Sequence, residues 1–277
     1  MGEEMTSLGE MYAVHVTEPD KERDPKRLFV TDVGKCPRQV GYRLRQTPKD
    51  YKSDQAEVNS RIMWDIADHL EAVLWDALQA KDLGRAYQFE CPIVGRENWG
   101  GRGDIIANYG GGWRVIEVKS LYPGAFSYEI NYPAHQYQAR IYDYYCKDIY
   151  SLTLPPILWY VDRGGQNTPV EQVVDMPWAP IEELMIELEI MRLGVDVTMP
   201  PQLPRELKER SYKKHIVEEG PWQCTRCDYH WTCEPDMSKH VWAKRDNTAL
   251  PYEATKAAEP GRLAAFVDSI NPALEGT

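Results

Sequence analysis

Two acidic residues and a lysine lie close together in the segment that runs from Gly101 to Lys119. Asp104 and Glu117 are thirteen positions apart, and Lys119 follows the glutamate by two. Two carboxylates form a hard oxygen site, which suits Mg²⁺ or Mn²⁺ better than Zn²⁺. Such an ion polarises a phosphoryl oxygen and activates a bound water, and a nearby ammonium stabilises developing negative charge. The three residues therefore predict metal-assisted hydrolysis.

A β-hairpin is predicted to carry these residues. Residues 102–108 contain an apolar run, three glycines at 110–112 form a turn, and residues 113–119 alternate as a strand does. Because side chains alternate along a strand, Glu117 and Lys119 project from one face and Val118 from the other. Surface hairpins also carry Glu and Lys as cross-strand charge pairs, so this segment alone leaves catalysis and a surface ion pair both open.

Two predicted helices bring further polar side chains. His69 lies in a helix expected over residues 56–80, next to a predicted buried stripe, so it is expected to border the core. The stripe consists of apolar residues at intervals of three and four, which are Ile62, Ile66, Leu70, Val73, Leu74 and Ala77. A helix over residues 132–147 places His135, Gln138 and Tyr142 on one face. That face either binds a phosphate or a water, or is simply solvated.

Five of the six cysteines fall into two groups. Cys224, Cys227 and Cys233 follow metal-ligand spacing in a turn-rich segment, whereas Cys91 and Cys146 lie in a predicted strand and helix and are expected to pack in the core. Intracellular cysteines in this number are more often metal ligands or buried thiols than disulfides. Thiolate ligands alone do not distinguish an iron–sulfur cluster from structural zinc. A zinc site using His230 is an alternative.

The predicted elements alternate between helices and strands after an irregular lead-in over residues 1–30. Helices are expected at four places, which are a short one opened by Cys36-Pro37 and residues 56–80, 132–147 and 179–194. Strands are expected at five places, which are residues 86–94, 102–108, 113–119, 151–161 and 169–175. A proline-rich linker follows over 199–204, and the tail over 236–277 is expected to be mostly irregular. This order predicts an α/β fold with a central mixed β-sheet flanked by helices.

Composition describes an ordinary globular chain of 277 residues with 43% apolar content. No segment approaches the roughly 20 apolar residues of a membrane helix, and the start lacks the pattern of a signal peptide, so we expect a cytoplasmic protein without membrane contact. A net charge of −11 does not favour nucleic-acid binding. Residues 21–52, however, carry ten bases against four acids, and residues 205–214 carry five against two. These basic segments are either solvated faces or a binding surface.

The motifs together resemble those of the RecB-type branch of the PD-(D/E)XK nucleases. The matching residues, in order, are His69, Gly101-x-x-Asp104, Glu117-x-Lys119 and Gln138-x-x-x-Tyr142. Cys36-Pro-Arg, followed some 190 residues later by Cys224-x2-Cys227-x5-Cys233, resembles the sub-branch with a [4Fe-4S] cluster, which includes CRISPR-associated exonucleases, the AddB nuclease domain and phage-encoded relatives. The resemblance covers residues 30–235. One departure is Asp65, where relatives often have glycine.

The resemblance implies a role for each matching residue. His69, Asp104, Glu117 and the Val118 carbonyl would hold Mg²⁺ or Mn²⁺, and Lys119 would be the catalytic lysine. The auxiliary motif, which contacts the substrate or orients the lysine, would be Gln138 and Tyr142. The cluster, or a structural Zn²⁺ in its place, would be held by Cys36, Cys224, Cys227 and Cys233.

A single nuclease domain over residues 31–235 is thus expected. It would have a restriction-endonuclease-like core, and its C-terminal cysteine region would pack against the N-terminal helix. The resemblance implies a metal-dependent DNA exonuclease that cuts phosphodiester bonds at DNA ends or in single strands. The alternative is a DNA-end-binding subunit with little or no catalysis that works with an integrase or a helicase. A weaker alternative is a site-specific restriction endonuclease.

Overall fold

A computed structural model describes residues 24, 26–49, 54–127, 130, 132–194, 200, 206–210, 215–219 and 227–233. The chain divides into two compact units, one of residues 1–46 with 57–198 and the other of residues 47–56 with 199–277. The expected tail over 236–277 lies outside the described residues, as does most of the expected lead-in.

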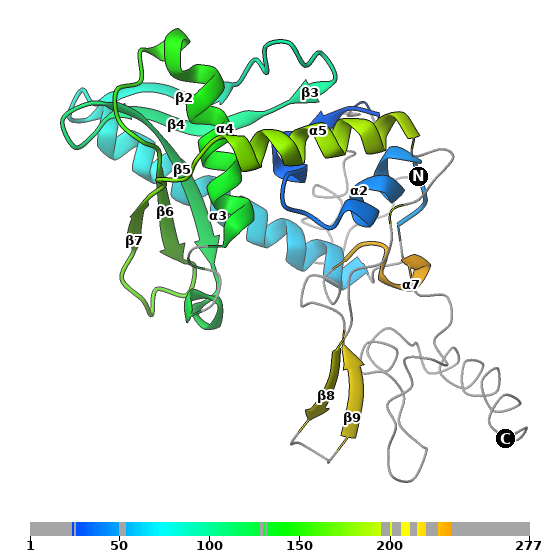
Figure 1. The fold of residues 1–277 in the computed structure, drawn as a ribbon. Coiled ribbons are helices and arrows are strands. Elements are labelled where there is room, and N and C mark those ends of the chain that lie inside the picture. The colour runs from blue at the N-terminus through cyan, green and yellow to red at the C-terminus, as the bar shows by residue number, and fades with distance from the viewer. Residues whose placement is uncertain are drawn as a thin grey trace, which may run out of the picture. The chain divides into compact units, whose positions relative to one another are not determined.

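The first unit is built around a five-stranded mixed β-sheet in the order β2-β4-β5-β6-β7 (Figure 1). Its strands are β2 (Gly84–Glu90), β4 (Arg102–Asn108), β5 (Trp113–Leu121), β6 (Ile157–Asp162) and β7 (Val170–Val173). Neighbouring strands are antiparallel except β5 and β6, which are parallel. A parallel pair requires a crossover, and α4 (Pro133–Tyr150) lies in this connection. The predicted central mixed sheet of an α/β fold is confirmed.

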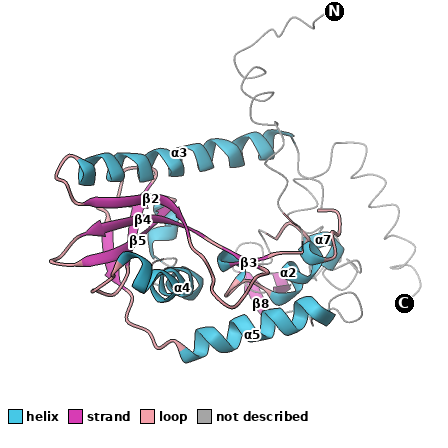
Figure 2. Ribbon diagram, turned by 90° about the horizontal axis from the view of Figure 1, so that it is seen from above, coloured by secondary structure: helices cyan, strands magenta, loops and turns pink. Residues whose placement is uncertain are grey.

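Helices α3 (Asp54–Gln79) and α4 pack on opposite faces of this sheet (Figure 2). On one face Leu78 of α3 packs in a cluster with Ile105 and Val118. On the other face Ala139 of α4 packs in a cluster with Leu158. Glu117 and Lys119 alternate with Val118 along β5, so they lie on the α4 face.

A smaller layer adjoins the sheet in the same unit. Strands β1 (Leu28–Phe29) and β3 (Trp99–Gly100) pair in parallel, and helices α2 (Pro37–Leu44) and α5 (Ala179–Gly194) pack together. Two short 3-10 helices are η1 (Val30–Asp32) and η2 (Pro123–Ser127). Pro37 occupies the first turn of α2, as predicted. The prediction of an irregular lead-in over residues 1–30 is wrong at its end, because Leu28 lies in β1 and is fully buried.

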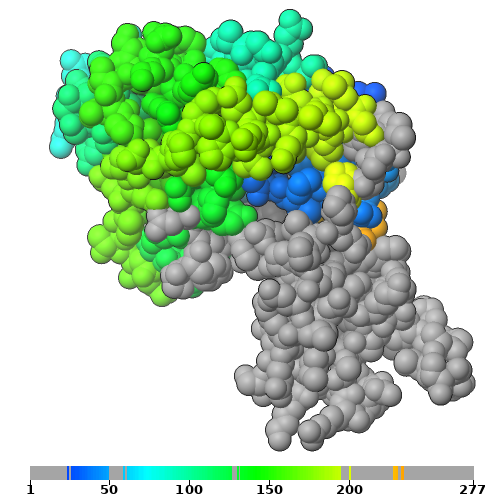
Figure 3. Space-filling model, in the orientation of Figure 1, coloured from blue at the N-terminus to red at the C-terminus, as the bar shows by residue number. Residues whose placement is uncertain are grey.

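Two helices expose apolar side chains. On α3, the predicted buried stripe is wrong in part, because Ile62, Ile66 and Val73 are 38%, 37% and 50% exposed. On α5, which lies at the surface in Figure 3, Ile190 and Leu193 are exposed. Among the helices of the described residues, none combines the length and the apolar content needed to cross a bilayer.

The strand predicted over residues 151–161 begins later, at Ile157. Helix α4 continues to Tyr150, and Ser151 then takes a left-handed conformation with φ of 53°, which ends the helix. Pro155 and Pro156 follow, and neither can donate a hydrogen bond to a strand ladder. The prediction is therefore wrong for residues 151–156.

In the second unit the structure describes three short elements. Strands β8 (Glu206–Arg210) and β9 (His215–Glu219) form an antiparallel hairpin, and α7 (His230–Cys233) is a single helical turn. Lys49 forms an ion pair of 3.1 Å with Asp228. Residues 199–204, the predicted linker, lie outside the described residues except for Pro200.

Replacing Gly103 by Ala is expected to lower the free energy of unfolding by about 1–3 kcal/mol, the usual cost of overpacking a core. An added Cβ would overlap the ring of Phe89, which is held edge-on between Tyr142 and Tyr150. Urea unfolding measures the change. Gly124→Ala is the matched control, because a Cβ there meets no atom within 4 Å. Equal stability of the two variants would contradict the packing at Gly103.

Candidate active site

Asp104 lies where regular pairing of β4 with β5 stops. The ladder runs from Asn108 to Ile105, and one residue further the Asp104 Oδ2 atom accepts a hydrogen bond of 2.7 Å from the Val118 N–H. A side-chain carboxylate thus joins the two strands at this point. Burial raises the pKa of Asp104, although the Lys119 ammonium and the Val118 N–H oppose the rise.

Glu117 and Lys119 form a buried, hydrogen-bonded pair on the α4 face of β5. The Lys119 Nζ atom lies 2.6 Å from Glu117 Oε1, and the glutamate is only 1% exposed. Burial, followed by repulsion from Asp104, raises the pKa of Glu117 to about 8. Burial lowers the pKa of Lys119, but the carboxylates of Glu117 and Asp104 outweigh this effect and leave the pKa raised. The two side chains therefore pair in the protein interior, and the alternative of a surface charge pair is wrong.

Helix α4 supplies two side chains to the same place. Gln138 Oε1 accepts a hydrogen bond of 3.0 Å from Lys119 Nζ, and Gln138 Nε2 lies 3.4 Å from the Tyr142 hydroxyl oxygen. Tyr142 is 1% exposed, and burial raises the pKa of its hydroxyl well above the ordinary value. The structure thus brings together five of the predicted site residues, which are Asp104, Glu117, Lys119, Gln138 and Tyr142.

One oxygen of this site lacks a partner. Glu117 Oε2 is buried and makes no hydrogen bond with any of the described residues. A buried carboxylate oxygen without a donor is costly unless a cation or a water meets it. Together with Asp104 it forms a pair of hard oxygen donors that fits Mg²⁺ or Mn²⁺. No set of three or more His, Cys, Asp or Glu side chains in the described ranges is arranged to hold a metal ion. With only two carboxylates, waters and substrate oxygens would fill the remaining positions, as is usual for Mg²⁺.

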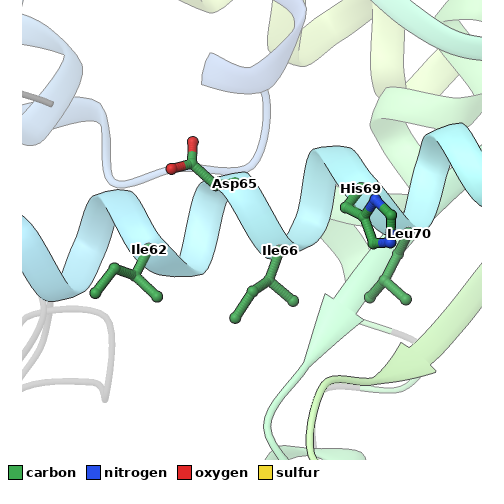
Figure 4. Close-up of a pocket in the computed structure, with 5 residues that line it drawn as sticks. All are labelled: Ile62, Asp65, Ile66, His69 and Leu70. Carbon is green, nitrogen blue, oxygen red and sulfur yellow. The ribbon is translucent and has the colours of Figure 1, made fainter. Parts of the chain in front are cut away.

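The structure does not bring His69 to these carboxylates. Its side chain is exposed on α3, on the opposite side of the helix from Leu78, which packs on the sheet. Figure 4 shows it next to Leu70, one turn along the helix from Ile66, at a pocket that these residues line. Asp65, which stands where relatives often have glycine, pairs with Arg61 at 3.3 Å.

Glu71, two residues after His69, occupies the sheet-facing side instead. Burial, followed by repulsion from Asp104 and Asp68, raises its pKa to about 7, and its carboxylate accepts a hydrogen bond from Gln88. The sequence signal for Glu71 was its spacing from Leu74 and Leu78, which places a carboxylate on an otherwise apolar helix face.

Gln88 shows an unusual backbone conformation beside this carboxylate. Its φ is 46°, a left-handed value that non-glycine residues rarely adopt, and the register of β2 with β4 places it opposite Asp104. Strained residues of this kind cluster at functional sites. Glu71 and Gln88 therefore lie beside Asp104 and are candidate site residues that the sequence analysis missed.

The cysteines occupy three environments. Cys91 and Cys146 are buried with their sulfur atoms 3.2 Å apart, which confirms that they are packing residues. Cys36 is the N-cap residue of α2 in the first unit, whereas Cys227 and Cys233 lie in the second unit. Cys224 lies outside the described residues. The cluster ligand set stays a prediction.

Comparison with known proteins gives little further information. No protein-family model matches the chain. No curated protein matches it. Among solved structures it is similar to one described as the crystal structure of SSO0001, with 23% identity and a TM-score of 0.43, covering 66% of this chain and 84% of that chain.

Proposed function

We propose that the protein is a Mg²⁺- or Mn²⁺-dependent deoxyribonuclease that hydrolyses phosphodiester bonds at DNA ends or in single strands. The observation that carries the proposal is the buried Oε2 atom of Glu117, which has no hydrogen-bond partner among the described residues. The Glu117 carboxyl lies near Asp104, and its other oxygen, Oε1, pairs with Lys119. The RecB-type pattern of motifs supports the choice of DNA as the substrate. Loss of cleavage in Asp104→Asn tests the proposal.

Each residue of the site has a task in this reaction. Asp104, Glu117 and the Val118 carbonyl would hold the metal ion, which would supply polarisation of the scissile phosphate and activation of a water. The Lys119 ammonium stabilises the charge that develops on the phosphoryl oxygens. Gln138 fixes the position of that ammonium through its Oε1 atom, and its amide is in turn placed by Tyr142.

Comparing two variants decides which residue of α3, His69 or Glu71, is a further metal ligand. The resemblance assigns His69 to the metal. The geometry favours Glu71, because it lies on the sheet side of α3 and Asp104 is close enough to raise its pKa, whereas His69 is exposed. We expect Glu71→Gln to reduce cleavage about 10–100-fold, since second carboxylates around a metal site commonly have effects of this size. His69→Gln is expected to change the rate less than about threefold.

Steady-state cleavage of labelled single-stranded DNA at several Mn²⁺ concentrations measures both variants. A raised metal requirement in Glu71→Gln alone supports the carboxylate. The reverse order, with His69→Gln the more damaged, would restore the histidine as ligand.

We also propose a structural [4Fe-4S] cluster held by Cys36, Cys224, Cys227 and Cys233, with Zn²⁺ as the alternative. Support comes from the spacing of the cysteines and from the resemblance. Thiolates from two distant parts of the chain would close a loop of nearly 190 residues, much as a cross-link does. Absorbance of anaerobically purified protein is expected to show a broad band near ~400 nm, which zinc would not give.

A further inference from the structure

His135 belongs to the site by position, although the proposed mechanism does not use it. It lies on α4 one turn before Gln138, on the helix face that Gln138 and Tyr142 share. Burial, followed by the charge of Lys119, lowers the pKa of its imidazole to about 3, so the ring is neutral beside the ammonium.

The His135 ring is oriented by Tyr160 of β6. Its Nδ1 atom lies 3.3 Å from the Tyr160 hydroxyl oxygen, and the two ring centroids are 5.8 Å apart. Tyr160 is the register partner of Lys119 on the neighbouring parallel strand, so both side chains project toward α4. Tyr160 is fully buried, which makes it a fixed support for the imidazole.

The other ring nitrogen of His135 is available to a ligand. Nε2 makes no hydrogen bond within the described part of the chain, and it does not belong to the buried polar atoms that lack a partner there. It is therefore open to solvent. A neutral imidazole carries its proton on one of the two nitrogens. In the tautomer in which Nδ1 accepts from the Tyr160 hydroxyl, the proton is on Nε2, which is then a hydrogen-bond donor.

We propose that His135 is a substrate-binding residue whose Nε2–H donates to a phosphodiester oxygen of the bound DNA strand beside Lys119. This inference rests on the proposed nuclease function and adds a binding contact to it. An anionic oxygen is the acceptor that suits a donor next to an ammonium. A neutral donor also adds no positive charge beside Lys119. A lysine or an arginine at position 135 would place a second positive charge there.

Three variants distinguish the roles of the two ring nitrogens of His135. His135→Asn places an amide near Nδ1 and loses the Nε2 donor, whereas His135→Gln places its amide nitrogen near Nε2. Tyr160→Phe keeps the imidazole and removes the hydroxyl that orients it. Binding of a fluorescein-labelled single-stranded oligonucleotide is followed by anisotropy, with Ca²⁺ replacing Mn²⁺ to limit cleavage.

We expect His135→Asn to raise the Kd about 10-fold, as for a lost hydrogen bond to a charged group, and Tyr160→Phe to raise it about threefold. His135→Gln is expected to stay within about threefold of the unmodified protein. Because the donor is neutral, the factor for His135→Asn should be equal at about 50 and 200 mM salt, whereas loss of a cationic contact would change the salt dependence.

Unchanged binding by His135→Asn, or equal losses for His135→Asn and His135→Gln, would overturn the inference. If His135→Asn does not fold, as judged by circular dichroism, unchanged binding by Tyr160→Phe overturns it instead. Cleavage by the unmodified protein in Mn²⁺, absent in Asp104→Asn, upholds the nuclease function whatever the His135 variants do. An unmodified protein that neither binds nor cuts DNA overturns both.

Discussion

Replacing Asp104 by Asn is expected to reduce Mn²⁺-dependent cleavage of single-stranded DNA at least ~10³-fold, because a metal ion contributes several kcal/mol to stabilising a phosphoryl transition state. The variant should fold normally. The Oδ1 atom of asparagine can still accept the hydrogen bond that the Val118 N–H donates to Asp104. Burial disfavours the charged carboxylate at this position, so a neutral amide costs little in the metal-free protein.

Asp148→Asn is the matched control, since this exposed carboxylate of α4 takes no part in the site. It should cut DNA as the unmodified protein does. Unchanged cleavage by Asp104→Asn would remove the residue from the site. DNA binding without cleavage by the unmodified protein would instead favour the DNA-end-binding subunit.

Replacing Glu117 by Gln is expected to stabilise the metal-free protein at alkaline pH. The pKa of Glu117 rises from an ordinary 4.5 to about 8 on folding, because burial and Asp104 disfavour the carboxylate. Above pH 4.5 the unfolded chain loses this proton while the folded protein keeps it up to about pH 8. The free energy of unfolding therefore falls across this window as pH rises, and Glu117→Gln escapes the fall.

Thermal melting at two pH values measures this effect. At about pH 8.5 and in EDTA, Glu117→Gln should melt about 4–8 °C above the unmodified protein, since each kcal/mol corresponds to about 2–4 °C for a domain of this size. At about pH 5 the difference should nearly vanish. Added Mn²⁺ should raise the Tm of the unmodified protein and leave that of Glu117→Gln almost unchanged. Equal pH dependence of the two proteins would contradict the raised pKa of Glu117.

The sequence predicted the parts of the site that depend on local periodicity. The hairpin of β4 and β5 follows from alternation and from a glycine turn, in which Gly110 and Gly111 have φ of 71° and 88°. Helical spacing placed Gln138 and Tyr142 on one face, and both lie at the site. These features need only the geometry of one element.

The sequence could not predict which way α3 faces. The predicted stripe ran from Ile62 to Ala77, but only the part near Leu74 packs on the sheet, together with Leu78. Apolar residues occur around much of this helix, so only the position of the sheet decides which of them are buried. The orientation of α3 determines that Glu71, and not His69, lies on the sheet-facing side. The hydrogen bond of Asp104 to the Val118 N–H was equally invisible, because it depends on where two strands stop pairing.

The buried thiols of Cys91 and Cys146 offer a reporter of motion at the site. They join the end of β2 to α4, four residues after Tyr142, and are 4% and 0% exposed. Their contact and their burial raise the pKa of Cys91, and thiol reagents attack only accessible thiolates. Labelling must therefore wait until α4 separates from the sheet, and its rate measures the free energy of that opening. A ligand that holds α4 in place through Gln138 would slow the labelling without touching either sulfur.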